Sequence, residues 1–220
     1  MITDRISKIN AQIPEHVQLV AVSKTHTQEK ILEAYNAGIK VFGENKVQEL
    51  VQKHTDLPKD IQWHFIGHLQ TNKVKYIAPF VSLIHAVDSL KLFKTIQKEA
   101  KKNNRIIPCL LQFHIAEEDT KFGLSLEEAQ EIIEYGIQEN CNNVAVYGVM
   151  GMATYTSNQE QVRSEFSCLR NMYNQLKEKY YKNSPDFSHI SMGMSDDYKL
   201  AIEEGSTMVR IGSEIFGSRY

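Results

Sequence analysis

The chain of 220 residues carries 25 Lys and Arg against 27 Asp and Glu, for a formal net charge of -2, and 42% of it is hydrophobic. This balance is that of a globular protein, which excludes a disordered or collagen-like chain and gives no basic surface for nucleic acid. No apolar stretch approaches the roughly 20 residues of a membrane helix, and residues 1–5 lack the apolar core of a signal peptide. The cysteines Cys109, Cys141 and Cys168 match no metal-binding or disulfide pattern, so we expect reduced thiols in a cytoplasmic protein.

Apolar, β-branched runs recur along the chain and predict eight β-strands. Several are almost continuously apolar, as strands buried on both faces of a parallel sheet are. Pro108 lies inside the fifth run, and because proline is unwelcome in a central strand we expect it to mark the strand's start. The predicted strands are residues 17–22, 39–42, 61–66, 81–86, 106–113, 144–149, 187–191 and 207–211.

The segments between these runs carry apolar residues at helical spacing. Gly38 is a good C-cap for the first helix, and residues 125–128 form a capping box that opens the fourth. The lysines of residues 91–102 predict a solvated helix face. The predicted helices cover residues 27–37, 45–54, 89–102, 125–140, 158–181 and 195–204.

Strands that alternate with helices indicate right-handed βαβ units around a parallel sheet. Eight such units predict an α/β fold of the (β/α)8 TIM-barrel type, a compact one since these barrels normally have about 250 residues. A doubly wound open sheet fits the same pattern. No linker, low-complexity tract or repeat interrupts the chain, so we expect residues 1–220 to form a single domain.

Lys24 comes two residues after the end of the first predicted strand. Barrel enzymes keep their sites at the C-terminal ends of the strands, where a lysine amine loses hydration and favours the neutral form that a Schiff base requires. The alternative is a lysine that caps the strand in full solvent. Position alone leaves both interpretations open.

The loops after the seventh and eighth strands combine glycines with hydroxyl groups and a cation. Gly193 and Ser195 follow the seventh strand, and Ser195 is a natural N-cap for the next helix. Arg210 lies at the end of the eighth, and Gly212 and Ser213 follow it. These two loops form the usual phosphate site of a (β/α)8 barrel, so together they predict an anion site.

Other interpretations of these loops remain. Ser195 could serve only as a helix cap, and Asp196 and Asp197 suit the first turn of a helix without any ligand. These carboxylates would repel a phosphate unless they point away from it. Arg210 could equally be the partner in a structural ion pair.

His64 and His68 have the spacing of a helical metal site but straddle a strand end and a glycine. They would not share a helix face, and no carboxylate lies nearby in sequence, which argues against metal. We interpret His64 as a polar group of the barrel interior and His68 as a loop residue. The chain has no serine-hydrolase, P-loop or dinucleotide motif.

Taken together, these loops resemble those of the YggS/PROSC-type pyridoxal phosphate homeostasis proteins, which are similar to the barrel domain of alanine racemases. The most specific segment is residues 63–73, WHFIGHLQTNK. Residues 20–24, 42–45, 191–197 and 210–212 match in the family's order as well. The resemblance covers essentially the whole chain.

The resemblance implies that Lys24 carries pyridoxal 5′-phosphate (PLP) as a Schiff base. Ser195, with the amides of Gly212 and Ser213, would hold the phosphate, and Arg210 would face the pyridine nitrogen. A guanidinium only donates hydrogen bonds, so the ring nitrogen would stay unprotonated and the cofactor would be a weaker electron sink. That disfavours chemistry such as transamination.

The resemblance also suggests that Asn45 and His64 flank the ring. The chain departs from the family after the fifth strand, where Gln112 and His114 stand in place of the usual valine and asparagine. The resemblance therefore does not extend to a ring contact at residue 114. The spacing of Glu118, Lys121 and Gly123 does match.

The leading hypothesis is a PLP-binding protein that carries or buffers the cofactor without turnover and acts in PLP homeostasis, with PLP-dependent apoenzymes as recipients. The alternative is an amino-acid racemase that uses Lys24 as one of its two bases. Racemases of this kind draw the opposite base from a further domain, which this chain does not offer. A Schiff-base aldolase would use the same lysine, but residues 63–73 argue against it. We expect a cytoplasmic monomer.

Overall fold

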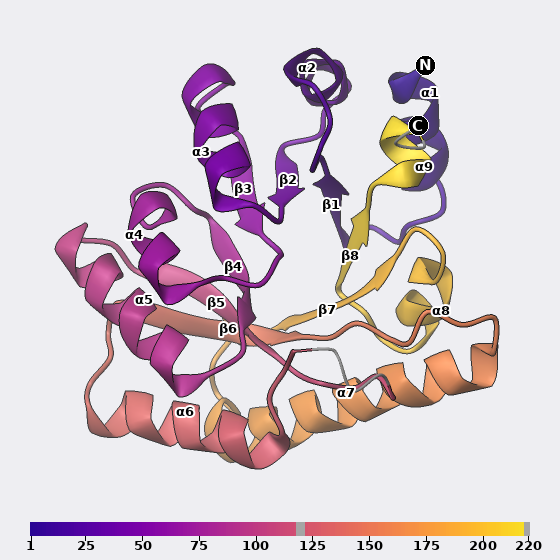
Figure 1. The fold of residues 1–220 in the computed structure, drawn as a ribbon. Helices are drawn as coiled ribbons and strands as arrows, with labels where there is room; N and C mark the ends of the chain where they lie inside the picture. Colours follow the sequence, from indigo (N-terminus) through magenta and orange to yellow (C-terminus); the bar gives the residue numbers. More distant parts are fainter. Residues whose placement is uncertain (118–121, 218–220) are drawn as a thin grey trace.

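The computed structural model describes residues 1–117 and 122–217. Its parallel strands close into a barrel in which each pairs with the next along the chain and β8 pairs with β1 (Figure 1). This confirms the predicted (β/α)8 barrel and rules out the open sheet. The strands are β1 (Gln18–Val22), β2 (Val41–Glu44), β3 (Gln62–Phe65), β4 (Leu83–Val87), β5 (Ile107–Gln112), β6 (Val144–Met150), β7 (His189–Met194) and β8 (Met208–Ile211).

Helices surround the barrel, and two of them have side-chain caps at their N-termini that follow from the sequence. Ser125 and Glu128 form the predicted capping box at α6, and the Ser89 hydroxyl accepts the Leu92 N–H at the start of α5. The lysines of α5 are exposed, as its pattern predicted. The helices are α1 (Ile2–Asn10), α2 (Gln28–Asn36), α3 (Val47–Asp56), η1 (Thr71–Lys73), α4 (Val74–Ile77), α5 (Leu90–Lys102), α6 (Leu126–Gln138), α7 (Gln159–Tyr180), α8 (Tyr198–Glu203) and α9 (Ser213–Phe216).

Helix α1 was not predicted. It packs against α2 and α9, so the N-terminal segment covers the barrel beside the last helix (Figure 1). Ile2, Ile6 and Ile9 form its buried stripe, and this spacing is the signal that could have revealed it. Among the described residues, none of the helices combines the length and apolar character that a membrane span requires.

Two strand boundaries can be compared with the prediction, the start of β5 and the end of β7. Pro108 is the second residue of β5 and pairs with Ala145, close to the predicted strand start. The prediction that Ser195 is the N-cap of a helix is wrong. Strand β7 continues to Met194, and the Asp197 carboxylate accepts the Met194 N–H at 2.6 Å, so the chain turns before α8 begins at Tyr198.

The barrel interior has an apolar plug below a polar layer. Val20, Val41, Leu83, Leu110, Met150 and Met208 form the plug. His85 and Arg210 come two residues after Leu83 and Met208 on the same strands, so they lie one layer nearer the C-terminal ends. The plug closes the bottom of the barrel and leaves its upper end for a site.

Candidate functional site

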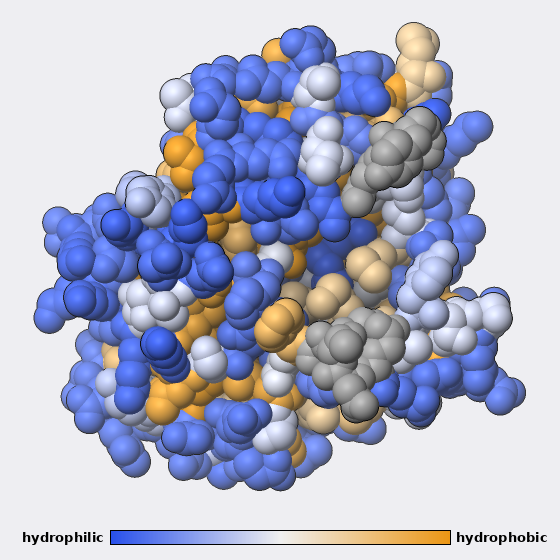
Figure 2. Space-filling model, viewed as in Figure 1, coloured by the Kyte–Doolittle hydropathy of each residue, from blue (hydrophilic) through white to orange (hydrophobic). Residues whose placement is uncertain are grey.

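A cavity of about 640 Å³ opens at the C-terminal ends of the strands. This size lies within the range of small-molecule sites. On the face shown in Figure 2 a hydrophilic surface gives way, near the middle, to a hollow with apolar side chains around its edge. The residues predicted from the loops that line this cavity are Lys24, Asn45, Ser195, Arg210, Gly212 and Ser213.

Lys24 enters the cavity from the turn that follows β1. Ser23 beside it is completely buried, and Thr25 has a φ of +68°, in the left-handed region that L-residues rarely adopt. The turn therefore has an unusual backbone conformation at the residue that follows Lys24.

The loops after β7 and β8 meet at one corner of the cavity. The Gly212 N–H donates to the Ser195 hydroxyl at 3.3 Å, and α9 begins at the next residue, Ser213. Gly193 has a φ of +95°, and a Cβ there would lie 2.6 Å from that of Ala201, so only glycine fits this turn. The two glycine loops thus converge as the anion-site prediction required.

The acidic residues of this corner differ in their orientation. The Asp197 carboxylate is bonded to the Met194 N–H, and burial raises the pKa of Asp197. It is not among the described residues that line the cavity, whereas Asp196 is exposed at the rim. Asp196 does line the cavity, so the fold of the turn directs only Asp197 away from a bound phosphate.

Arg210 is 4% exposed, at the floor of the cavity. Its Nη1 donates to the Ser191 carbonyl at 2.9 Å and to the Ser191 hydroxyl at 2.6 Å, and its Nη2 donates to the Gly151 carbonyl at 3.1 Å. These bonds use three of the five guanidinium N–H donors, so others remain for a ligand. Burial lowers the pKa of Arg210 to about 10, which still leaves a cation at neutral pH.

Asn45 presents an unsatisfied polar atom. Its buried Oδ1 has no hydrogen-bond partner within the described residues, although Asn45 lines the cavity. Buried polar groups in native proteins are nearly always paired, so a ligand with a hydroxyl or amine would complete this site.

His64 does not line the cavity. It is 4% exposed inside the barrel, with Nδ1 at 3.0 Å from His85 Nε2, and burial lowers the pKa of His64 to about 3. His85 Nδ1 in turn lies 3.0 Å from the Ser191 hydroxyl. The interior assignment of His64 therefore fits its position, and the expectation that it flanks the ring does not.

Several residues of the cavity were not predicted. His68 stacks on Phe122 with ring centroids 4.3 Å apart, and its Nδ1 lies 2.9 Å from the Asp88 carboxylate. Gln112 also lines the cavity, and its place at the end of β5 was the available signal. Met152 and Met194 add apolar surface, for which the sequence has no signal.

The departure at residue 114 lies away from the cavity. His114 is exposed and is absent from the described residues that line it. Glu118 and Lys121, whose spacing matches the family, lie outside the described residues.

Comparison with known proteins gives matches along the whole chain. The family described as "Alanine racemase, N-terminal domain" matches residues 1–220. A pyridoxal phosphate homeostasis protein of Aquifex aeolicus (strain VF5) is 45% identical over 203 residues, covering 92% of this chain and 87% of that relative. The human protein of the same name is 35% identical over 234 residues, covering 99% of this chain and 84% of the relative.

Solved structures agree with these matches. PipY of Synechococcus elongatus PCC7942, solved with PLP bound, has a TM-score of 0.87 at 33% identity, covering 99% of this chain and 100% of that one. The alanine racemase of Streptomyces coelicolor A3(2) has a TM-score of 0.81 at 13% identity, which shows a shared fold, and this chain covers 57% of it. The chain therefore belongs to the alanine racemase N-terminal domain family and, within it, to the pyridoxal phosphate homeostasis proteins.

Proposed function

We propose that this protein binds PLP as a Schiff base to Lys24 and carries or buffers the cofactor in PLP homeostasis, without catalytic turnover. The observation that carries the proposal is one cavity that combines the Lys24 amine, the Arg210 guanidinium and the converging Ser195 and Gly212 loops. Relatives that are 33% to 45% identical bear the cofactor in their names or contain it.

Each group of the cavity has a counterpart in the proposed ligand. PLP supplies an aldehyde that condenses with an amine, a phosphate, a ring hydroxyl and a pyridine nitrogen. Lys24 would provide the amine, and Ser195 with the amides of Gly212 and Ser213 would hold the phosphate. The remaining donors of Arg210 would face the pyridine nitrogen, and the ring hydroxyl is a group that could satisfy the buried Oδ1 of Asn45.

The same residues argue against turnover. A guanidinium beside the pyridine nitrogen keeps that nitrogen unprotonated, which limits how strongly the ring withdraws electrons. A racemase also needs a base on each face of its substrate. No tyrosine is among the described residues that line the cavity. None of these residues therefore offers a phenol group as the second base opposite Lys24.

We further propose that residues 1–220 form one domain that acts as a cytoplasmic monomer and supplies PLP-dependent apoenzymes. The barrel strands extend from Gln18 to Ile211, so the fold uses nearly all of the chain. Large exposed apolar side chains such as Leu32 of α2, Ile106 before β5 and Ile137 of α6 come from separate parts of the chain rather than from one stripe.

Reduction with borohydride tests the anchor. Purified protein incubated with PLP should turn yellow, and reduction should fix the cofactor on the peptide that contains Lys24, as read by mass spectrometry. Lys24→Ala should lose this adduct, whereas Lys91→Ala, at an exposed lysine of α5, should keep it. A protein that cannot be loaded, or an adduct that persists in Lys24→Ala, would contradict the proposal.

Hydrogen exchange separates a carrier from a racemase. The loaded protein is incubated with L-alanine in heavy water, and the α-hydrogen and stereochemistry of the alanine are followed by NMR and chiral chromatography. A carrier should leave both unchanged. Exchange with inversion that disappears in Lys24→Ala would establish the racemase instead.

A further inference from the structure

A buried cluster of charged residues lies behind the turn that carries Lys24. Lys53 of α3 is 5% exposed, and Glu44, the last residue of β2, is completely buried. Glu49, one helical turn before Lys53, completes the cluster and is partly buried. Charges are rarely buried without a role because their desolvation costs more than most pairings return. We call these three residues the Lys53 cluster.

The Lys53 ammonium is fully used by this arrangement. Its Nζ donates to the Glu44 carboxylate at 2.7 Å, to the Glu49 carboxylate at 2.7 Å and to the Ser23 carbonyl at 2.8 Å. An ammonium has three donors, so every one has a partner. Two of these bonds hold the cluster together, and the third reaches the residue that precedes Lys24.

Both chain neighbours of Lys24 are bonded to the cluster. The Ser23 hydroxyl donates to the Glu44 carboxylate at 2.6 Å, in addition to the bond that its carbonyl accepts from Lys53. On the other side, the Thr25 N–H donates to the Glu49 carboxylate at 2.6 Å. Lys24 thus extends into the cavity from a turn that is held on each side.

The conformation of Thr25 shows why this support is needed. Its φ of +68° is unfavourable for a β-branched residue, and such conformations persist only where the surroundings impose them. Two bonds hold it: the His26 N–H donates to the Ser23 carbonyl at 3.1 Å across the turn, and the Thr25 N–H donates to Glu49 at 2.6 Å as the contact from the cluster. Without the bond to Glu49 we expect the turn to relax toward an ordinary conformation and to redirect Lys24.

The charges of the cluster are consistent with this role. Burial raises the pKa of Glu44, opposed by the Lys53 cation, and Glu44 Oε2 is buried with no hydrogen-bond partner among the described residues. Partial burial would raise the pKa of Glu49, but the hydrogen bonds from Lys53 and Thr25 outweigh it and the net direction is down. Glu49 is therefore the ionised acceptor that holds Thr25.

We propose that Lys53 is a positioning residue, which acts with Glu44 and Glu49 to fix the turn at Ser23 and Thr25 so that the Lys24 amine is presented to the cavity. The proposal rests on the proposed role of Lys24 as the PLP anchor. It differs from a purely stabilising role because it makes the reactivity of Lys24 depend on residues that do not line the cavity.

The decisive variants are at Glu49, whose carboxylate is partly exposed. Glu49→Leu removes the acceptor of the Thr25 N–H, whereas Glu49→Gln keeps an amide oxygen that can accept the same bond. Lys53→Met should act like Glu49→Leu, but it leaves a buried carboxyl without its cation and risks unfolding the chain. Lys40→Met, at the exposed Lys40–Asp60 ion pair, is the matched control.

Two readouts are needed. The first labels the cofactor-free protein with trace acetic anhydride and measures by mass spectrometry the modification of Lys24 relative to that of exposed Lys91. The second measures PLP affinity and the absorbance of the bound cofactor. Since a misplaced reactive group of this kind costs on the order of tenfold to a hundredfold, we expect Glu49→Leu to lose that much affinity and to change the Lys24 to Lys91 ratio.

Glu49→Gln and Lys40→Met should stay within about twofold of wild type in both readouts, far below that loss. A folded Glu49→Leu variant whose labelling ratio equals that of wild type would overturn the proposal, even if its melting temperature falls. Because the labelling uses cofactor-free protein, this result is independent of borohydride fixation. Failure of wild-type PLP to be fixed on Lys24 would instead overturn the proposed function.

Discussion

Arg210 is the residue whose surroundings most restrict what the cavity can do. Its guanidinium is bonded to the hydroxyl of Ser191 and to the carbonyls of Ser191 and Gly151, and the described residues give it no salt bridge. The sequence left open whether Arg210 is a structural ion-pair partner. Its hydrogen-bond partners are neutral, and the negative charge of Asp197, which is not bonded to it, raises the pKa of Arg210 against the effect of burial. A buried cation whose direct partners are neutral attracts an electron-rich ligand atom.

Replacing Arg210 tests this contact. Arg210→Gln should weaken PLP binding by about tenfold to a hundredfold, since a hydrogen bond from a charged group contributes roughly 1.5–3 kcal/mol. It should also shift the absorbance maximum of the bound cofactor. Titration followed by absorbance measures both, and Arg163→Gln, at a surface pair with Glu203 and Glu204, should change neither. Unchanged affinity and spectrum in Arg210→Gln would mean that Arg210 does not touch the ring.

Among the structural elements, the loop after β3 and the loop after β2 depend on each other. A Cβ on Gly67 would lie 2.5 Å from the Asn45 carbonyl oxygen and 2.8 Å from the Asn45 Cα. Only a residue without a side chain allows this approach, so Gly67 fixes where Asn45 stands in the cavity. Gly67, the glycine of the segment 63–73, is thus required by the close packing of its loop against a residue of the cavity.

Gly67→Ala should therefore displace Asn45. We expect unfolding free energy to fall by about 1–3 kcal/mol, as for other overpacked positions, and PLP affinity to fall with it. Gly136→Ala in α6 is the control, because its Cβ would meet only the ring of Phe93, with Cζ at 3.2 Å and Cε1 at 3.5 Å. Stability should change by no more than about 1 kcal/mol. Urea unfolding and PLP titration measure the two effects. If Gly67→Ala lowers stability but leaves PLP affinity unchanged, the position of Asn45 does not contribute to PLP binding.

The elements also show which parts of the site the sequence could predict. Lys24 and Gly212 come within two residues of the end of an apolar run, and loops in that position form the site end of a barrel. His85 lies within an apolar run, and its direction depends on strand register, which the sequence does not contain. The end of β7 was also missed, because the left-handed Gly193 and a register shift between Ser191 and Met194 extend that strand.

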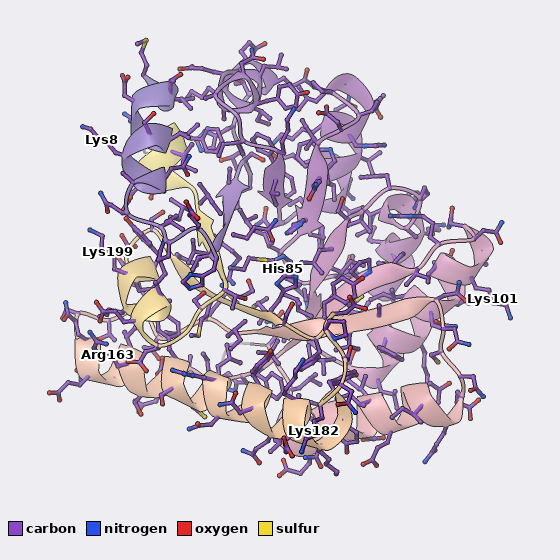
Figure 3. All side chains as sticks on the ribbon, turned by 180° about the vertical axis from the view of Figure 1, so that it is seen from behind. Lys8, His85, Lys101, Arg163, Lys182 and Lys199 are labelled. Carbon is purple, nitrogen blue, oxygen red and sulfur yellow. The ribbon has the colours of Figure 1, made fainter. Side chains whose placement is uncertain are left out.

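For the molecule as a whole, the barrel interior holds a connected polar layer beneath the site. Arg210 donates to the Ser191 hydroxyl, which is then free to donate its proton to His85 Nδ1. Neutral His85 would carry its proton on Nε2 and donate it to His64 Nδ1. Every bond in this series points away from the Arg210 cation. Figure 3 shows His85 inside the barrel, whereas labelled residues such as Lys101 lie at the periphery.

This layer makes stability depend on pH in a defined direction. Burial lowers the pKa of His64 from 6.5 to about 3, and that of His85 well below its usual value, by burial and the nearby positive charges. In the unfolded chain both would bind protons near pH 6.5, whereas the folded state does not. A histidine with a depressed folded pKa stabilises the fold above pH 6.5, and this contribution is lost as pH falls toward 3.

His64→Gln should make the stability of the cofactor-free protein less sensitive to acid. Each such histidine contributes a slope of up to about 1.4 kcal/mol per pH unit below its unfolded pKa, so wild type should lose about 2 kcal/mol more than the variant between roughly pH 7 and pH 5. Urea midpoints at the two pH values measure the difference. Buried Glu44, whose folded pKa is raised, contributes with the opposite sign above its unfolded pKa. Because Glu44 is present in both proteins, its contribution cancels in the difference between wild type and His64→Gln. His16→Gln, at an exposed histidine, is the control and should lose as much stability as wild type. If His64→Gln also loses as much stability as wild type, then His64 takes up a proton as readily in the folded state as in the unfolded chain.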